Sequence, residues 1–319
     1  MKYCFDIETD GFLHDCTKVH CIVLKNVDTG EVLHPSSNEP AIKLLEEADE
    51  IIGHNIIKFD IPVLEKLYNF KTKAKIFDTI VATRLLFPDI RDSDYKRTDF
   101  PANCIGRHSL KAWGHRVGNY KEVFDTDWKE YSPAMLDYCI QDVEVTTSLY
   151  KMIQNRGYSE QAMKLEHNVA SLIFKQEQHG FTFNKEEAEK LYSKLSARRI
   201  ELEDELQKIF TPIVTKRVSE KTGKQLKDKV TVFNPSSRFH IAQRLTEKYN
   251  WQPEEFTPDG KPKLDDTILS KLDYPEAKLL AEHFLLDKRL GQLAVGNQAW
   301  LKAESKGKIH GTCNTNSTV

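Results

Sequence analysis

The sequence predicts an α/β domain with a mixed sheet in its first half and a mainly helical region in its second half. Strand and helix patterns alternate up to about residue 155, and helical patterns dominate from about residue 160. A length of 319 residues is typical of about two domains. The content of 39% hydrophobic and 29% charged residues is typical of a globular protein with enough apolar side chains for a core.

The first half opens with strands. A strand is predicted over residues 3–7, followed by a hairpin over residues 19–35 that turns at Asp28-Thr29-Gly30. A short apolar run over residues 50–55 indicates a further, buried strand.

Amphipathic segments with local start signals predict the helices of this half. Pro62 is tolerated in the first turn of its helix, Asp78 caps the next one, and Ser132 and Pro133 begin the longest. A polar loop is expected over residues 88–107. The predicted helices cover residues 41–49, 60–70, 78–86, 108–118 and 132–154.

The second half begins with helical periodicity from about residue 160 to 210. It stops at Gly180 and restarts after Asn184. The first of these helices is expected to pack through one apolar face, formed by Ala162, Leu165, Val169 and Leu172.

The remainder of the chain is more polar. Residues 208–229 hold seven Lys or Arg against two acids, which indicates a flexible basic tip. Residues 234–249 combine an Asn-Pro turn with a serine-capped helix, and another helix is expected from about Pro275 to Ala303. Residues 306–319 show no folding pattern of their own.

Several protein classes are disfavoured by the composition. No run approaches the roughly 18 apolar residues of a membrane span, and the N-terminus lacks the apolar core of a signal peptide. The six cysteines are scattered without a CxxC pair, which favours reduced thiols and argues against a zinc site. We therefore expect a cytoplasmic protein without membrane partners.

The charge is unevenly distributed along the chain. Residues 1–150 carry 18 basic and 25 acidic side chains, a net charge of −7, whereas residues 151–319 carry 28 and 23, a net charge of +5. An acidic half that binds cations and a basic half that contacts phosphates would produce this asymmetry. Solvated charged surfaces would produce it as well.

Two acids at the end of the first strand raise a chemical question. Asp6 and Glu8 are two residues apart, so their side chains lie on the same face of the strand, about 6–7 Å apart along the chain. Two like charges at this distance are costly unless a positive charge lies between them. A solvated acidic pair at a sheet edge is the alternative.

Acids elsewhere in the sequence favour the cation. Asp60 begins a helix after a buried strand, and Tyr138 and Asp142 are one helical turn apart and share a face. Four carboxylates from three separated segments are what two hard divalent cations require, with magnesium or manganese as the natural choice. Two such ions can promote in-line phosphoryl displacement by water.

Three segments resemble the motifs of the DEDD 3′–5′ exonucleases of the tyrosine subclass. They are FDIETDG, GHNIIKFD and YCIQDVEVT. The whole chain resembles the N-terminal part of family A DNA polymerases of podovirus-type phages, because further matching segments follow in order: HSLKAWGHRVG, GFTFN, ARRIELEDEL, VFNPSSR, KRLGQ and GKIHGTCNTN. The resemblance implies a ribonuclease H-like exonuclease domain over residues 1–157 and a helical, thumb-like DNA-binding region over residues 158–319 that ends before the palm.

Roles for individual residues follow from this resemblance. Asp6, Glu8, Asp60 and Asp142 are expected to hold two Mg²⁺ or Mn²⁺ ions, and Tyr138 is expected to orient the attacking water through its hydroxyl. Thr9 and Asn55 match positions that hold the 3′-terminal nucleotide. Phe12 and Leu13 are either a wedge against the terminal base or simple core contacts, and His54 is expected to be structural.

The second half is expected to contact the DNA backbone without reading its sequence. The expected contact residues are Ser236, Ser237, Arg238, Lys288 and Arg289. Some relatives carry a long insertion near residues 208–229 that recruits a host redox protein as a processivity clamp. Only about twenty residues occupy that place here, so we expect no thioredoxin-type clamp.

The resulting hypothesis is a metal-dependent 3′–5′ DNA exonuclease that releases 5′-monophosphates, the proofreading part of a phage family A polymerase. Its partners would be a single-stranded or frayed 3′ end, the primer-template duplex, and a palm and fingers in the same gene or on a separate chain. No polymerase activity is expected from this chain alone, because it lacks the palm and fingers. The alternatives are an RNase D-like 3′-exoribonuclease and a non-catalytic DNA-binding or assembly subunit of a split polymerase.

Overall fold

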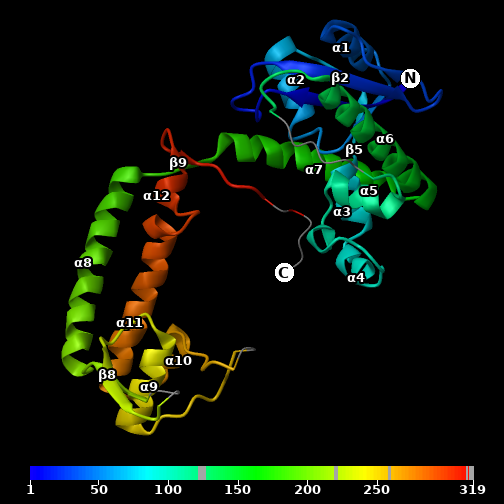
Figure 1. Ribbon diagram of the computed structural model, residues 1–319. Helices are drawn as coiled ribbons and strands as arrows, with labels where there is room; N and C mark the ends of the chain where they lie inside the picture. Colours follow the sequence, from blue (N-terminus) through cyan, green and yellow to red (C-terminus); the bar gives the residue numbers. More distant parts are fainter. Residues whose placement is uncertain (121–126, 219–221, 258–259, 314, 316–319) are drawn as a thin grey trace. The chain divides into compact units, whose positions relative to one another are not determined.

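The computed structural model describes residues 1–120, 127–218, 222–257, 260–313 and 315 (Figure 1). The chain divides into two compact units. The first is Met1–His179 together with the C-terminal segment from Thr312, and the second is Gly180–Gly311. The division between the units therefore lies after the helix α7 (Glu160–His179), whereas the boundary expected from the sequence, at residue 157, precedes this helix.

The first unit is built on a five-stranded mixed sheet, which confirms the predicted fold class. The central strand β1 pairs with β2 in the antiparallel sense and with β4 in the parallel sense, and β4 pairs with β5 in parallel. The order across the sheet is β3 (Val32–Leu33), β2 (Val19–Asn26), β1 (Lys2–Thr9), β4 (Glu50–Gly53) and β5 (Lys75–Asp78).

Alternation along the strands divides the core into two layers. Side chains of one face, such as Phe5 and Ile51, pack with the helices α1 (Asn38–Glu46) and α2 (Asp60–Tyr68). Side chains of the other face, such as Cys4 and Ile52, pack with a second group of helices, visible on the opposite side of the sheet in Figure 1. This group includes α3 (Thr79–Leu86), α5 (Leu110–Val117) and α6 (Pro133–Arg156).

Side-chain caps set the starts of these helices. Asp78 accepts a hydrogen bond from the Ile80 amide at the start of α3, and Ser132 accepts one from the Met135 amide at the start of α6. Pro133 occupies the first turn of α6, as predicted.

The segment expected to be a polar loop contains the helix α4 (Ile90–Tyr95) and a 3₁₀ turn (Ala102–Cys104), so that prediction was wrong. A buried ion pair explains the difference. Arg116 donates two hydrogen bonds to the Asp94 carboxylate, with N–O distances of 2.7 and 3.0 Å. The Gly106 amide donates to the same group. This tertiary contact leaves no periodic signal in the sequence.

Helix α7 packs through a different face from the predicted one. Met163 and His167 are its buried residues, whereas Leu165 and Leu172 are 59% and 65% exposed. His167 accepts a hydrogen bond from the Asp78 amide at the end of β5, which sets the rotation of the helix against the sheet edge.

In the second unit, the long helices α8 (Lys185–Ile209) and α11 (Pro275–Leu290) run side by side (Figure 1). Arg198 of α8 donates two hydrogen bonds to Glu282 of α11. The C-terminal end of α8 and the N-terminal half of α11 pack in one apolar cluster with α9 (Arg238–Tyr249) and α10 (Asp266–Ser270).

Three expectations for this unit need correction. The basic tip contains an antiparallel pair of strands, β7 (Ile213–Val218) and β8 (Gln225–Thr231). The single helix expected to reach Ala303 is divided: α11 ends at Leu290, a π-helical turn follows over Gly291–Val295, and α12 (Trp300–Ala303) is a separate short helix. The C-terminal stretch contributes β10 (Lys308–Ile309), which pairs with β6 (Phe181–Thr182) and β9 (Glu304–Ser305).

Within the described ranges, no helix has both the length and the apolar character needed to cross a membrane.

Candidate metal centre

A cavity of about 450 Å³ in the first unit collects acidic and polar side chains from β1, α2 and α6. All five residues expected at the reacting centre line it: Asp6, Glu8, Asp60, Tyr138 and Asp142. Segments more than 130 residues apart in the sequence therefore meet at one place, because β1 is the central strand and α6 packs directly against it.

The acids on β1 lie at the end of the strand next to α6. Glu8 is buried, and the ladder with β2 is irregular between Glu8 and Thr9. The Cys139 thiol of α6 donates weak hydrogen bonds to the backbone oxygen and to Oδ2 of Asp6, with sulfur–oxygen distances of 3.5 and 3.7 Å. One carboxylate oxygen of Asp6, one of Glu8 and the Cys139 sulfur lie within 4.8 Å of one another.

Asp60, the first residue of α2, is 3% exposed. Its Oδ1 is buried without a hydrogen-bond partner among the described residues. Burial, together with the neighbouring carboxylates of Asp78 and Asp142, raises the pKa of Asp60 to about 7. A buried carboxylate with an unsatisfied oxygen beside other acids is an environment that suits a cation.

The donor set fits a hard divalent cation. Carboxylate oxygens from Asp6, Glu8, Asp60 and Asp142 are the ligand type that magnesium and manganese prefer. Burial raises the pKa of the Cys139 thiol well above its usual value, and the thiol donates to Asp6.

Tyr138 and Asp142 are four residues apart on α6, and both side chains line the cavity, as their spacing predicts. The Tyr138 ring packs edge to face against Trp128, with ring centroids 5.9 Å apart. Trp128 is a residue that the sequence analysis missed. It lies outside any helix or strand, so no periodic pattern marks it.

A mostly apolar pocket of about 430 Å³ adjoins the acidic cavity. Glu8, Phe59 and Trp128 line both, and Thr9, Gly11 and Phe12 complete the second. Phe12 is 81% exposed, whereas Leu13 packs partly buried against the core. The two residues therefore have different surroundings: Phe12 is exposed beside the apolar pocket, whereas Leu13 packs against the core.

The other residues expected to contact the terminal nucleotide lie close by. The Thr9 hydroxyl donates to the Gly11 carbonyl at 2.8 Å, which holds the turn after β1. Asn55 lines the acidic cavity and has a left-handed backbone with φ of 70°. His54 hydrogen-bonds the Thr79 hydroxyl through Nδ1 at 2.8 Å.

The residues expected to contact duplex DNA lie in the second unit, where several also have structural contacts. Ser237 caps α9, and Arg238 donates to the Leu264 carbonyl. Ser236 donates to Asp287, and Arg289 donates to Gln292. Lys288 is exposed on α11. Their contacts with DNA stay predictions.

Comparisons with known proteins identify similar chains. Residues 13–157 match the family model of the 3′–5′ exonuclease domain of family A DNA polymerases. The DNA-directed DNA polymerases of Escherichia phage T7 and Enterobacteria phage T3 are each 29% identical to this chain across 98% of its length. The chain spans 60% of the length of these two relatives.

A solved structure gives a similar result for the fold alone. The POL domain of Pol1 from M. smegmatis, in complex with DNA primer-template and dNTP, is 14% identical and superposes with a TM-score of 0.61. The match covers 98% of this chain and 49% of that structure.

Proposed function

We propose that this chain, which matches a 3′–5′ exonuclease family model over residues 13–157, removes mispaired nucleotides from DNA 3′ ends as the proofreading part of a family A DNA polymerase. The observation that carries the proposal is the single cavity lined by Asp6, Glu8, Asp60, Asp142 and Tyr138. The products would be 5′-monophosphates.

The proposed cofactors are two Mg²⁺ or Mn²⁺ ions, which would supply acidification of a water and neutralisation of charge on the scissile phosphate and the leaving 3′ oxygen. The four carboxylates would hold them. Without a cation, about half of the Asp60 carboxyl groups would hold a proton at neutral pH, because burial and neighbouring carboxylates raise the pKa to about 7. Cation binding therefore releases this proton and relieves the burial of an unsatisfied oxygen.

The remaining residues of the centre would bind and orient the reacting groups. The Tyr138 hydroxyl would position the attacking water, and the edge-to-face contact with Trp128 restricts where that hydroxyl can lie. The apolar pocket beside Phe12, Phe59 and Trp128 would receive an unstacked base. A mismatched end would be favoured because unpairing it costs less.

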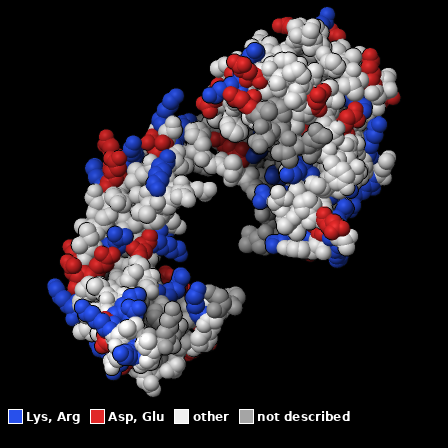
Figure 2. All heavy atoms as spheres, in the orientation of Figure 1, with Lys and Arg blue, Asp and Glu red and all other residues white. Residues whose placement is uncertain are grey.

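The second unit would hold the primer-template duplex. Figure 2 shows Lys and Arg side chains gathered at the end of this unit that carries the β7–β8 hairpin and α9. The hairpin exposes a set of cations on its strands and turn: Lys216, Arg217, Lys224, Lys227 and Lys229. Such a cluster would contact backbone phosphates without reading sequence. The palm and fingers would come from the rest of the polymerase. The protein would act in the host cytoplasm.

A double substitution tests the proposal. D6A/E8A removes the two acids of β1, and we expect at least a thousandfold slower release of nucleotides from a single-stranded DNA in Mg²⁺, with circular dichroism unchanged. The matched control is Asp137→Asn, which removes an exposed acid one residue from Tyr138 and leaves the rate unchanged. A D6A/E8A chain that digests DNA at the wild-type rate would refute the assignment.

The same assay separates the rival functions. With DNA and RNA oligonucleotides of matched sequence, the proposal expects faster degradation of DNA. Faster degradation of RNA would identify an RNase D-like enzyme. Absence of release from either oligonucleotide, in Mg²⁺ or Mn²⁺, would identify a non-catalytic subunit.

A further inference from the structure

Two consecutive buried residues outside the acidic cavity hold the segment that carries part of it. Asp78 ends β5 and Thr79 begins α3, and they are 1% and 0% exposed. Asp78 Oδ1 accepts hydrogen bonds from the amides of Asn55 at 2.9 Å and Ile80 at 3.0 Å. Asp78 Oδ2 accepts a third, from the Ile57 amide at 3.1 Å. One carboxylate therefore joins the start of α3 to the segment after β4.

Thr79 contacts the same segment through its hydroxyl. Its Oγ1 donates to the Gly53 carbonyl at 3.1 Å and lies 2.8 Å from His54 Nδ1. A hydroxyl has one proton to donate, and Gly53 receives it, so His54 must donate to Thr79. The two side chains together make four hydrogen bonds to residues 53–57.

The segment that these hydrogen bonds hold has an unusual backbone shape. A Cβ on Gly53 would lie 2.2 Å from Cγ2 of Ile56, so only glycine fits this close turn. Asn55 adopts φ of 70°, in the left-handed region. The segment ends at Asp60, and His54, Asn55 and Asp60 all line the acidic cavity.

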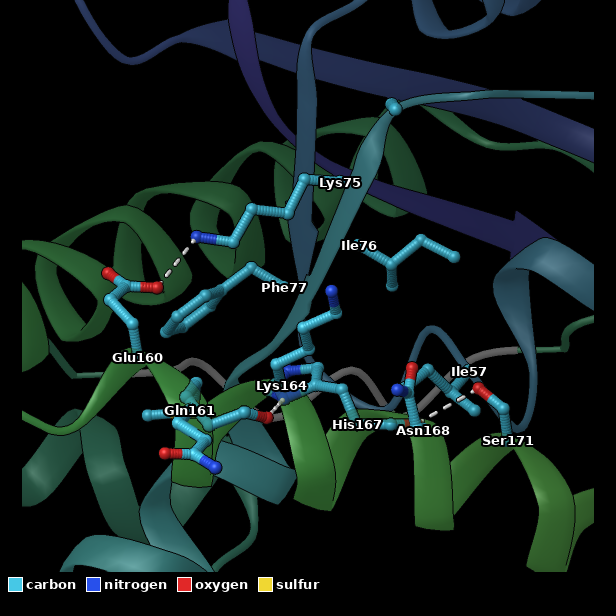
Figure 3. Close-up of a pocket in the computed structure, with 12 residues that line it drawn as sticks. Ile57, Lys75, Ile76, Phe77, Glu160, Gln161, Lys164, His167, Asn168 and Ser171 are labelled. Carbon is cyan, nitrogen blue, oxygen red and sulfur yellow. Dashed lines mark hydrogen bonds and ion pairs between the residues drawn. The ribbon is translucent and has the colours of Figure 1, made fainter.

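A third residue supports the pair from the other side. His167 Nε2 accepts a hydrogen bond from the Asp78 amide at 2.8 Å, which leaves the proton on Nδ1 to donate to the Met163 carbonyl. Figure 3 shows His167 on α7 among the residues that line a cavity of about 640 Å³ next to β5. The backbone of Asp78 is thereby fixed to a helix as well as to the sheet.

We infer that Asp78 and Thr79 are positioning residues of the proposed exonuclease site: they set where Asp60 and Asn55 lie relative to the acids of β1. Neither residue lines the acidic cavity, so both act through the segment they hold. The inference rests on the proposed function. Groups that hydrogen-bond a metal ligand directly commonly change metal affinity or activity by 10- to 100-fold, and the lower end is expected here because Asp78 and Thr79 act through the segment that leads to Asp60.

A pair of substitutions at one position isolates the hydroxyl. In the full chain, Thr79→Val keeps the shape of the side chain but loses the contacts with Gly53 and His54, whereas Thr79→Ser keeps the hydroxyl. We expect Thr79→Val to weaken Mn²⁺ binding about tenfold, measured by calorimetry without DNA, and to lower kcat about tenfold with KM nearly constant. Thr79→Ser should stay within about twofold of wild type in both measurements.

Asp78→Asn provides a second variant should Thr79→Val fold poorly. In this variant the side-chain amide nitrogen, which is a donor, would face a backbone N–H that now donates to the Asp78 carboxylate, so one hydrogen bond is lost. The same weakening of Mn²⁺ binding is therefore expected. All measurements are made below the melting temperature of each variant. If both variants only melt at lower temperature, while Mn²⁺ affinity and kcat match wild type, the residues are merely structural and the inference is overturned.

The outcomes also separate this inference from the proposed function. If the wild-type chain degrades DNA, and Thr79→Val and Thr79→Ser have the same Mn²⁺ affinity and the same kcat, only the positioning role is overturned. A wild-type chain that neither binds Mn²⁺ nor degrades DNA overturns both.

Discussion

Asp60 illustrates, at the scale of one residue, how a carboxylate suited to binding a cation lowers the stability of the metal-free fold. Its carboxyl is buried, one of its oxygens lacks a hydrogen-bond partner in the described part of the chain, and its pKa rises from 3.8 to about 7. As the pH rises from about 4 to 7, the unfolded chain releases this proton and the folded chain keeps it. The metal-free fold therefore loses stability over this range.

Asp60→Asn should consequently stabilise the metal-free protein while abolishing nuclease activity. At pH 8 in a chelator, we expect its melting temperature to exceed that of wild type by about 5 °C, because a buried charge has been removed. The difference should shrink toward zero near pH 4, where wild-type Asp60 is also neutral. Added Mn²⁺ should raise the melting temperature of the wild type only. A metal-free variant that melts below wild type at pH 8 would contradict this account.

At the scale of single elements, patterns fixed by local geometry were predicted well. The spacing of two residues on β1 puts Asp6 and Glu8 on one face, and the spacing of four on α6 does the same for Tyr138 and Asp142, because strand and helix periods do not depend on the rest of the fold. The packing of α6 against β1 then brings both pairs to one cavity. Trp128, Thr79 and the contacts of Asp78 beyond its predicted helix cap escaped prediction, since they depend on distant segments. The two-residue strand β10 is too short for periodicity to reveal it.

Helix α7 shows why a hydrophobic pattern can indicate the wrong face. Its leucines predicted one orientation, but the hydrogen bond from the Asp78 amide to His167 and the burial of Met163 favour another. A buried polar pair that is satisfied in only one orientation outweighs two exposed leucines.

This orientation can be tested by stability measurements on α7. Leu165→Gln and Leu172→Gln alter exposed side chains, so each should change the free energy of unfolding by less than about 0.5 kcal/mol. Met163→Ala empties a core position and should cost about 2–5 kcal/mol. Urea denaturation checks both values. Larger losses from the leucine variants than from Met163→Ala would restore the face expected from the sequence.

At the scale of the whole molecule, every residue expected to hold a cation belongs to the first unit, and the second unit has an apolar core of its own. A ligand that binds only the folded form of one unit stabilises that unit by mass action. Hydrogen exchange followed by mass spectrometry can measure the two units separately in the intact chain. With Mn²⁺ at 100 times its dissociation constant, we expect slowly exchanging peptides of residues 1–179 to gain about 2.7 kcal/mol of protection.

Peptides from residues 180–311 should stay unchanged under the same conditions, because no expected ligand lies there. The D6A/E8A chain serves as the control, and neither unit should respond to Mn²⁺ in it. Equal protection of both units in the wild type would show that they unfold together, and the division of the chain into two independent units would then be wrong. Protection confined to the second unit would place the cations away from the acidic cavity, and the proposed centre would have to be abandoned.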